Sequence, residues 1–285
     1  MSFLYIVSTP IGNLGDITYR AVEVLGAVHR ILAEDTRRTS ILLRHYGIKT
    51  PLVSAYEHVE ASRAARVVEW LDAGEDLALV SDAGTPLLSD PGARIVQRVI
   101  ESGHTVIPVP GASALLAALV GSGLSAEPFG FFGFLPRSGK ARAERLAEMA
   151  AFGHTVVVYE SPARLVRLLR DLEALWGPEG KVVVARELTK VHETFTRGTL
   201  AEVAAYYERQ PARGEIVVVV EGRRGGERGE GEGVAEEEAR SLARGLLEEG
   251  QAPSAVARQL ARRLGIPRNR AYEIALSVAS EGEGA

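Results

Sequence analysis

Short apolar runs alternate with amphipathic stretches along the first half of the chain. The apolar runs predict strands at Phe3–Val7, Ile31–Ala33, Leu77–Val80 and Thr105–Val109. The stretches between them repeat their apolar residues at helical spacing and predict helices over about Ile17–Val28, Arg37–Tyr46, Glu60–Ala73 and Pro91–Glu101. This alternation favours a mostly parallel sheet covered on both faces, with ligands at the carboxyl ends of its strands.

The alternation stops near Ala126–Pro136, where Pro, Gly and Phe dominate, and it resumes at Lys140. The later pattern predicts helices at Lys140–Phe152, Pro162–Trp176 and Leu200–Glu208, and strands at Thr155–Tyr159, Lys181–Ala185 and Glu215–Val220. Between them, Thr189–Gly198 mixes Thr, Phe and charged residues in a way that suits an antiparallel strand pair. A second α/β domain with a sheet that is not purely parallel is therefore expected.

The last part of the chain has a different character. Arg223–Gly233 is rich in Gly, Glu and Arg and predicts a flexible linker. Three helical patterns follow, at Val234–Glu249, Ser254–Leu264 and Arg268–Ser280, with Gly265–Pro267 as a tight turn. Gln251–Ala275 carries five Arg and one Glu, and its spacing resembles a helix-turn-helix module. The expected organisation is two α/β domains over residues 1–125 and 126–222, a linker over 223–233 and a basic helical module over 234–285.

Composition narrows the class of protein. With 46% hydrophobic and 25% charged residues the chain is expected to be globular, and no apolar run is long enough to span a membrane, so a cytoplasmic protein is expected. There is no cysteine, which excludes disulfides, thiolate zinc sites and thiol nucleophiles, and the six His residues show no metal-ligand spacing. The net charge of −4 means that a polyanionic partner must be met by local basic patches.

Three loops follow predicted strands and carry candidate chemistry. Ser8–Asp16 contains glycines that let backbone approach a ligand, although this stretch alone favours an ordinary strand-to-helix turn. Ser81–Gly92 concentrates Asp, Gly, Pro, Ser and Thr at the expected ligand edge. Val109–Ala114 begins a helix with small residues, which suits either a ligand against free N–H groups or close packing on the sheet.

Three acidic residues in these loops have expected roles. Asp82, at a strand end, is a candidate for holding ribose hydroxyls or an amino group. Asp90, directly before Pro91, is expected only to cap the next helix, and Asp16 is expected to cap the first one.

Taken together, several stretches resemble the tetrapyrrole methylase superfamily, and within it the branch that methylates a ribose 2′-hydroxyl of small-subunit ribosomal RNA. The resemblance covers about Met1–Gly222 and rests on Ser8–Thr18, Ser81–Gly92, Val109–Ala114, Gly133–Arg137, Tyr159–Pro162 and Arg186–Lys190. It implies an α/β fold of two domains with S-adenosylmethionine in the cleft between them, a homodimer, and a cytidine in the decoding region of 16S rRNA as substrate, expected within the small ribosomal subunit. No metal is expected, because methyl transfer from a sulfonium to an alcohol is an in-line displacement that needs none.

The same resemblance implies which residues hold the donor. They are Pro10, Gly12, Asp82, Thr85, Ser113, Ala114, Tyr159, Ala185 and Glu215. The first loop lacks the Gly-x-Gly-Pro-Gly run of the corrin-ring methylases, which counts against a tetrapyrrole substrate.

Methyl transfer to a hydroxyl needs alignment of the reacting atoms and gains from a general base. The sequence does not identify that base; its candidates are Glu34, Asp35, Glu187, His192 and Glu193. The basic residues expected to contact RNA phosphates are Arg37, Arg38, Arg137, Lys140, Arg186 and Lys190.

Two other functions stay open. One is methylation of a small molecule such as a corrin precursor. The other is a regulator whose α/β body senses a metabolite while residues 254–280 bind DNA. A Rossmann dinucleotide enzyme is a weaker alternative, because Gly12 and Gly15 do not fit the GxGxxG spacing.

Overall fold

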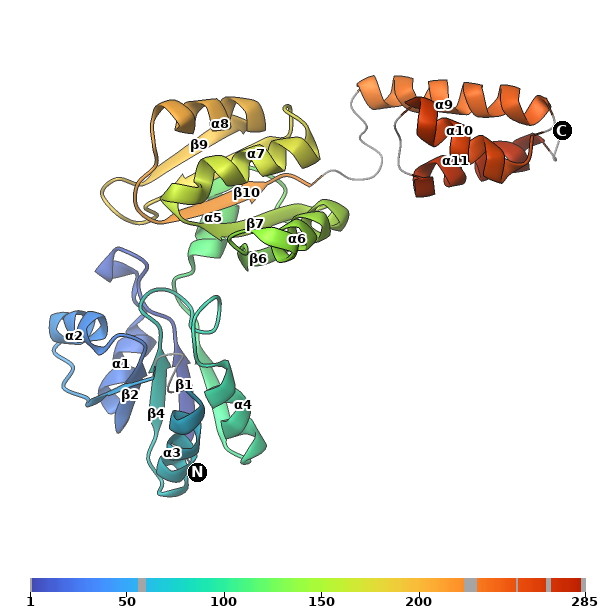
Figure 1. Cartoon of the computed structure of the whole chain (residues 1–285). Coiled ribbons are helices and arrows are strands. Elements are labelled where there is room, and N and C mark those ends of the chain that lie inside the picture. The colour runs from blue at the N-terminus through green and yellow to red at the C-terminus, as the bar shows by residue number, and fades with distance from the viewer. Residues whose placement is uncertain (1, 56–59, 223–229, 250, 265–267, 283–285) are drawn as a thin grey trace. The chain divides into compact units, whose positions relative to one another are not determined.

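The computed structural model describes residues 2–55, 60–222, 230–249, 251–264 and 268–282. The chain forms two compact units, residues 1–223 and residues 224–285. The first unit contains two five-stranded sheets, and each sheet has helices on both faces (Figure 1).

The first sheet has the strand order β3-β2-β4-β1-β5, and all its strand pairs are parallel. Its strands are β1 (Phe3–Val7), β2 (Arg30–Ala33), β3 (Leu52–Ser54), β4 (Leu77–Val80) and β5 (Thr105–Val109). The expected parallel sheet is therefore confirmed. Strand β3 was not expected, because three residues are too few to show a hydrophobic period.

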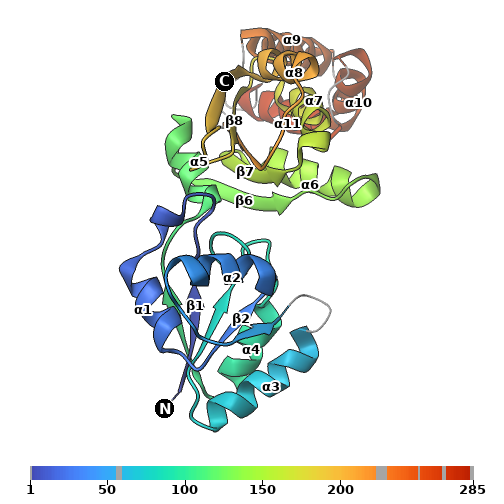
Figure 2. The ribbon, with the colours of Figure 1, turned by 90° about the vertical axis from the view of Figure 1, so that its left-hand side faces the viewer.

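Four helices cover this sheet: α1 (Tyr19–Ala27), α2 (Thr36–His45), α3 (Glu60–Asp72) and α4 (Ala93–Glu101). Figures 1 and 2 show α3 and α4 on one side of the strands and α1 on the other. Leu32 and Leu79 point to the α3–α4 side and pack with Val67 and Ile95. Their neighbours in the strands point to the α1–α2 side, so both faces of each strand are apolar, as a covered parallel sheet requires.

Two expected helix caps are wrong. Asp16 ends a short 3₁₀ helix, η1 (Leu14–Asp16), and the residue that caps α1 is Thr18, whose hydroxyl accepts a hydrogen bond from Ala21 N at 3.1 Å. Helix α4 begins at Ala93, and its N-terminal cap is Gly92, without a side-chain hydrogen bond. Asp90 is therefore not a cap, because two more residues separate it from the start of the helix.

The second sheet has the order β6-β7-β10-β8-β9. Its strands are β6 (Phe129–Phe134), β7 (Thr155–Glu160), β8 (Lys181–Arg186), β9 (Thr194–Thr199) and β10 (Ile216–Val220). Only β6 and β7 pair in parallel, so this sheet is mixed, as expected. The strand pair expected within Thr189–Gly198 is wrong: that stretch contributes one strand, β9, which pairs with β8.

The helices of the second sheet are α5 (Ala114–Ser122), α6 (Gly139–Phe152), α7 (Leu165–Trp176) and α8 (Leu200–Arg209), with a 3₁₀ turn, η3 (Pro162–Arg164), before α7. Helices α6, α7 and α8 cover one face. The other face packs on α5, through Leu115, Ala118 and Leu119 against Val157 and Val217 (Figure 1). Helix α5 follows β5 of the first sheet directly, so its first residues join the two sheets.

The second unit consists of helices α9 (Glu230–Glu248), α10 (Pro253–Leu264) and α11 (Arg268–Gly282) around a core of their own, which includes Ala243, Leu260 and Ala275. Helix α9 begins at Glu230, so the last residues of the expected linker are helical. The rest of that linker and the expected turn at Gly265–Pro267 lie outside the described residues. None of the described helices is long and apolar enough to cross a membrane.

Candidate functional site

A cavity of about 360 Å³ lies where loops of the first sheet meet strand ends of the second. Most of its lining comes from the loop after β4, the start of α5, the end of β7 and the start of β10, and single residues come from the first loop, β6 and the segment after β8. Prominent among the lining residues are Thr85, Leu88, Ser89, Asp90, Ser113, Ala114, Tyr159, Ser161, Leu188, Glu215 and Ile216. A mostly apolar cavity of this size with a few convergent polar groups is typical of a small-molecule site.

The loop after β4 has an unusual backbone. Leu87 and Ser89 have φ of 74° and 71°, and Gly84 and Gly92 are also in the positive-φ region. A non-glycine residue in this conformation costs about 1–2 kcal/mol. Leu87 packs into the core of the first sheet, which helps to hold the loop in this shape while Leu88 and Ser89 are exposed. The strained loop thereby presents Ser89 and Asp90 to the cavity.

Hydrogen bonds join this loop to the first loop and to α5. Thr9 and Gly84 form an isolated antiparallel bridge with N–O distances of 2.9 and 3.0 Å. The Thr85 hydroxyl donates to the carbonyl of Ala112 at 3.2 Å and lies 3.1 Å from the Ser8 hydroxyl. The wall of the cavity is therefore built from three loops that are fixed to one another.

Burial raises the pKa of two titratable side chains in this wall, Asp90 and Tyr159. It raises the pKa of Asp90, and the nearby charge of Asp82 raises it further, whereas a hydrogen bond with the Ser81 side chain acts in the opposite direction. Burial also raises the pKa of Tyr159, as does the charge of Asp90, while a hydrogen bond from the Leu115 amide lowers it. The charge of Asp90, in a loop of the first sheet, thus acts on Tyr159 of the second sheet at this cavity.

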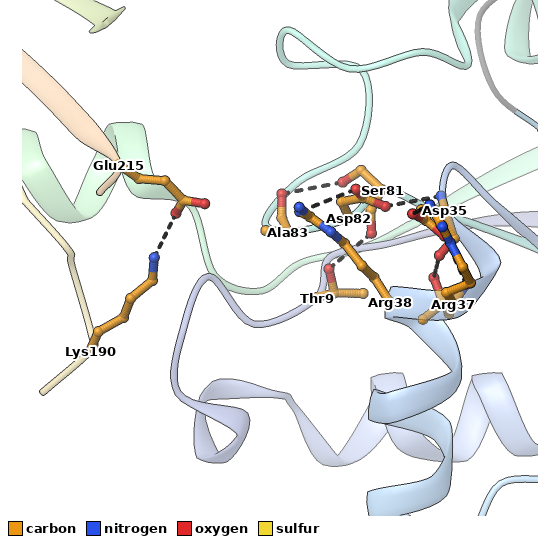
Figure 3. Close-up of polar contacts among 10 residues, drawn as sticks. Thr9, Asp35, Arg37, Arg38, Ser81, Asp82, Ala83, Lys190 and Glu215 are labelled. Atoms are coloured by element: carbon orange, nitrogen blue, oxygen red, sulfur yellow. Dashed lines mark hydrogen bonds and ion pairs between the residues drawn. The ribbon is translucent and has the colours of Figure 1, made fainter. Parts of the chain in front are cut away.

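A second, smaller pocket of about 150 Å³ lies beside the first loop and is lined by Thr9, Pro10, Arg38, Asp82 and neighbouring residues. The Asp82 carboxylate accepts a hydrogen bond from Asp35 N at 3.0 Å and lies 3.4 Å from the Arg38 guanidinium (Figure 3). The hydrogen bonds of Arg37, from its side chain and its backbone, lower the pKa of Asp35 to about 2. The pocket is thus lined by one charged pair, Arg38 and Asp82, and a second pair, Arg37 and Asp35, lies in the same helix start.

The segment after β8 makes polar contacts beyond the cavities. Lys190 Nζ lies 2.9 Å from Glu187 Oε1 and 3.1 Å from Glu215 Oε2; Figure 3 shows the second of these ion pairs. The Asn13 amide of the first loop donates to the Thr189 hydroxyl at 3.0 Å. The segment after β8 therefore binds both the first loop and the start of β10.

The model of the Tetrapyrrole (Corrin/Porphyrin) Methylases matches residues 3–204, which is most of the first unit. The chain belongs to this family. The resemblance stated from the sequence is thus confirmed, as is the α/β fold with helices at the C-terminus.

Curated relatives agree with this family assignment. The chain is 44% identical to "Ribosomal RNA small subunit methyltransferase I" of Synechocystis sp. over 99% of this chain and all of that protein. It is 46% identical to the protein of the same name from Bacillus subtilis, over 78% of this chain and 76% of that one.

Solved structures share the fold at much lower identity. The uroporphyrin-III-C-methyltransferase from Thermus thermophilus has a TM-score of 0.55 and 19% identity, over 77% of this chain and 94% of that one. A diphthine synthase has a TM-score of 0.61 and 15% identity, over 78% of this chain and 90% of that one.

The structure separates the expected donor-binding residues into groups. Those that line the larger cavity are Thr85, Ser113, Ala114, Tyr159 and Glu215. Pro10 and Asp82 line the smaller pocket. Gly12 faces the segment after β8, where a Cβ would come within 2.5 Å of Lys190, so only glycine fits there. Ala185 is buried in β8 among the residues that pack against α5.

The candidate bases have different surroundings. Glu34 is half-buried, and its pKa is raised first by burial and then by the charges of Asp82 and Asp90. The Arg37 guanidinium pairs with Asp35, and Lys190 pairs with Glu187. His192 and Glu193 are exposed, and Glu193 accepts a hydrogen bond from Thr189 N at 2.6 Å. None of these candidates lines the larger cavity.

The residues expected to contact RNA differ in their exposure and in the partners that they already have. Arg37, Arg38, Arg137 and Lys140 are exposed. Arg186 donates to the Thr194 hydroxyl and to the carbonyl of Arg213. Lys190 is held between Glu187 and Glu215, so its charge is already compensated.

Sequence reasoning missed Asp90, Ser89, Ser161 and Leu188 in the cavity wall. The signal for Asp90 was present, since it lies in the same polar loop as Asp82. The Asp-Pro pair, which matches a typical helix-start pattern, concealed it.

Proposed function

We propose that the protein transfers the methyl group of S-adenosylmethionine to the ribose 2′-hydroxyl of a cytidine in the decoding region of 16S rRNA. The observation that carries this proposal is the 44% identity over almost the whole length of both chains to a protein named for methylating the small-subunit ribosomal RNA. The family match and the large cavity support it.

The larger cavity has the properties that the methyl donor requires. The volume of about 360 Å³ and the apolar wall suit a nucleoside with a short chain attached. Ser113 and Ala114 put small side chains at the start of α5, where the first backbone N–H groups have no acceptor within the helix. Thr85, Tyr159 and Glu215 add polar groups at the wall. When bound, the donor supplies an electrophilic methyl group, and these residues would orient it.

RNA would be held by exposed cations near these loops. Arg37 and Lys140 have 89% and 90% of their side chains exposed. Their ion pairs with Asp35 and Glu144 are therefore weak and can be exchanged for phosphate. Such contacts give affinity, whereas the choice of one ribose depends on how the RNA presents its 2′-hydroxyl.

The experiment that tests the proposal uses labelled donor with three acceptors: unmodified small ribosomal subunits, naked 16S rRNA and a corrin precursor. We expect the label on a ribose of the rRNA, where it blocks alkaline cleavage of the adjacent phosphodiester. Label on the corrin precursor alone would favour the small-molecule reaction. Donor binding without transfer to any acceptor, together with binding of DNA, would favour the regulator.

The helical unit is proposed to assist RNA docking and to be dispensable for folding of the rest. Each unit has its own core, and a linker of this composition is expected to leave the two units independent in folding. A chain that ends at Gly222 should remain soluble, bind the donor with unchanged affinity by calorimetry, and bind rRNA more weakly. Aggregation of this truncated chain would show that the helices cover part of the α/β core.

We further propose a homodimer in the cytoplasm. Helix α5 carries exposed apolar side chains one turn apart, Leu116 at 50% and Val120 at 76% exposure. A second copy would remove such residues from water. Light scattering should give twice the chain mass of 30.6 kDa, and Val120→Asp should reduce it to the monomer if α5 lies in the interface.

A further inference from the structure

Methyl transfer to a hydroxyl releases a proton, and a nearby base must take it. The titratable side chains that line the larger cavity are Asp90, Tyr159, Glu160 and Glu215. A group that accepts the proton must be accessible, unprotonated near neutral pH and not already neutralised by a cation. These criteria separate the four side chains.

Three of them fail. The Glu160 side chain is completely buried and pairs with Arg164 at 2.5 Å. Glu215 is paired with Lys190 and is mostly exposed to solvent. Tyr159 has a pKa raised above 10.0, so its phenol keeps its proton near neutrality.

Asp90 differs from these three in its contacts. It is half-buried at the cavity wall, and none of the ion pairs found among the described residues involves it. The groups that face it are the carboxylates of Asp82 and Glu34 from the first sheet and the phenol of Tyr159 from the second. Its surroundings therefore favour uptake of a proton.

The backbone provides independent support. Asp90 does not cap α4, so no structural role in that helix explains it. It directly follows Ser89, whose positive φ of 71° turns the chain toward the cavity. A Cβ at Gly133 of β6 would lie only 3.0 Å from the Ser89 hydroxyl, so the second sheet closes on this loop. Strained backbone held by packing is typical of functional positions.

We propose that the Asp90 carboxylate takes the proton of the acceptor hydroxyl during methyl transfer, an assignment that rests on the proposed function above. The 2′-oxygen forms a bond to the methyl carbon while the bond from that carbon to the donor sulfur breaks. The electron pair stays on sulfur, which becomes a neutral thioether. The hydroxyl proton moves to Asp90 and then to water.

The test compares the wild type with Asp90→Asn, which keeps the shape of the side chain and removes its basicity. With donor-saturated enzyme and unmodified small subunits, the single-turnover rate of ribose methylation should fall by about 10²–10⁴-fold. Donor affinity by calorimetry should stay unchanged. In the wild type the rate should rise with pH as Asp90 loses its proton, and this rise should be absent from Asp90→Asn. Asp72→Asn on α3, an exposed carboxylate that pairs with His104, is the matched control and should keep the wild-type rate.

A second readout does not depend on catalysis. Carboxyl NMR of the donor-free protein, with the Asp90 signal assigned by its loss in Asp90→Asn, should show a titration midpoint above the ordinary value of 3.8. A midpoint at or below 3.8 would overturn the assignment. So would an Asp90→Asn protein that methylates ribose at the wild-type rate, or one that loses only donor affinity. A wild type that leaves every ribose unmodified contradicts the proposed function instead.

Discussion

The two pockets beside the loop after β4 contain carboxylates in opposite electrostatic surroundings. Beside the smaller pocket, Arg37 lowers the pKa of Asp35 to about 2, and in its lining Arg38 lies 3.4 Å from Asp82. In the larger cavity, burial and a neighbouring carboxylate raise the pKa of Asp90. The pockets share one loop, so the difference comes from where the cations lie.

This difference suits each pocket to a different ligand. Exposed guanidinium groups beside the smaller pocket can bind the phosphates of a polyanion. In the larger cavity Asp90 has no ion-pair partner among the described residues, so the cavity favours a positively charged molecule, and a sulfonium donor carries such a charge. The arrangement would keep the RNA backbone and the donor on separate sides of one loop.

The largest expected effect on stability comes from removing the cationic partner of a fully buried carboxylate. Glu160 is fully buried, Arg164 is its cation, and its Oε2 has no hydrogen-bond partner among the described residues. Arg164→Ala would leave an unpaired buried charge and should lower the free energy of unfolding by about 3–5 kcal/mol.

Denaturant unfolding measures this loss. The control is Arg170→Ala, which removes the exposed partner of Glu173 and Glu208 and should cost less than about 1 kcal/mol. Equal losses in the two variants would show that burial is not what distinguishes the carboxylates.

The next effect concerns the cations expected to bind RNA. Replacing Arg37, Arg38, Arg137 and Lys140 by Ala should weaken rRNA binding and flatten its salt dependence by about 0.7 logarithmic units for each phosphate that is no longer bound. If all four bind phosphate, the wild type should lose about 50-fold more affinity than the variant between about 50 and 200 mM salt. Filter binding over that range measures both slopes, and calorimetry should show unchanged donor affinity. Wild-type methylation by this variant in moderate salt would place RNA entry elsewhere, with the basic helices after Gly250 as the next candidate.

Replacement of Asp82, which lines the smaller pocket, tests whether that pocket affects donor binding in the larger cavity. Asp82→Ala should weaken donor binding by about 1–3 kcal/mol, because it removes the acceptor of the Asp35 amide and loosens the loop that lines the larger cavity. Calorimetry on the folded variant gives the answer. Unchanged affinity would remove Asp82 from the donor site and assign it to the smaller pocket alone.

The sequence predicted those parts of the fold that depend on local periodicity. Strands such as β1 and β4 and the helices between them follow from the spacing of apolar residues. It failed at β6, since the glycines of Phe129–Phe134 resembled a hinge, and that strand depends on pairing with β7. Asp90 was misassigned for a similar reason: its surroundings depend on Tyr159 and the second sheet, which no local pattern reveals.

The smallest expected effect is a pair of opposite pH dependences of stability. Asp90 has a folded-state pKa above 3.8, so the folded protein binds its proton more tightly than the unfolded chain does, and stability falls as pH rises from 3.8 through the folded-state pKa. Asp90→Asn should therefore be more stable than the wild type near neutrality, by less than about 1 kcal/mol because the group is partly solvated, and equally stable below pH 3.8.

Asp35 should behave in the opposite way. Its folded-state pKa of about 2 lies below 3.8, so its contribution is present above 3.8 and is lost as pH falls toward 2. Asp35→Asn should be less stable than the wild type near neutrality, and the difference should vanish in acid. Thermal unfolding of both variants across this range measures the two trends. The sign of each effect follows from whether burial or a neighbouring guanidinium dominates the pKa of the carboxylate. If both variants change stability in the same direction near neutrality, the guanidinium groups beside the smaller pocket do not cause the difference between Asp35 and Asp90.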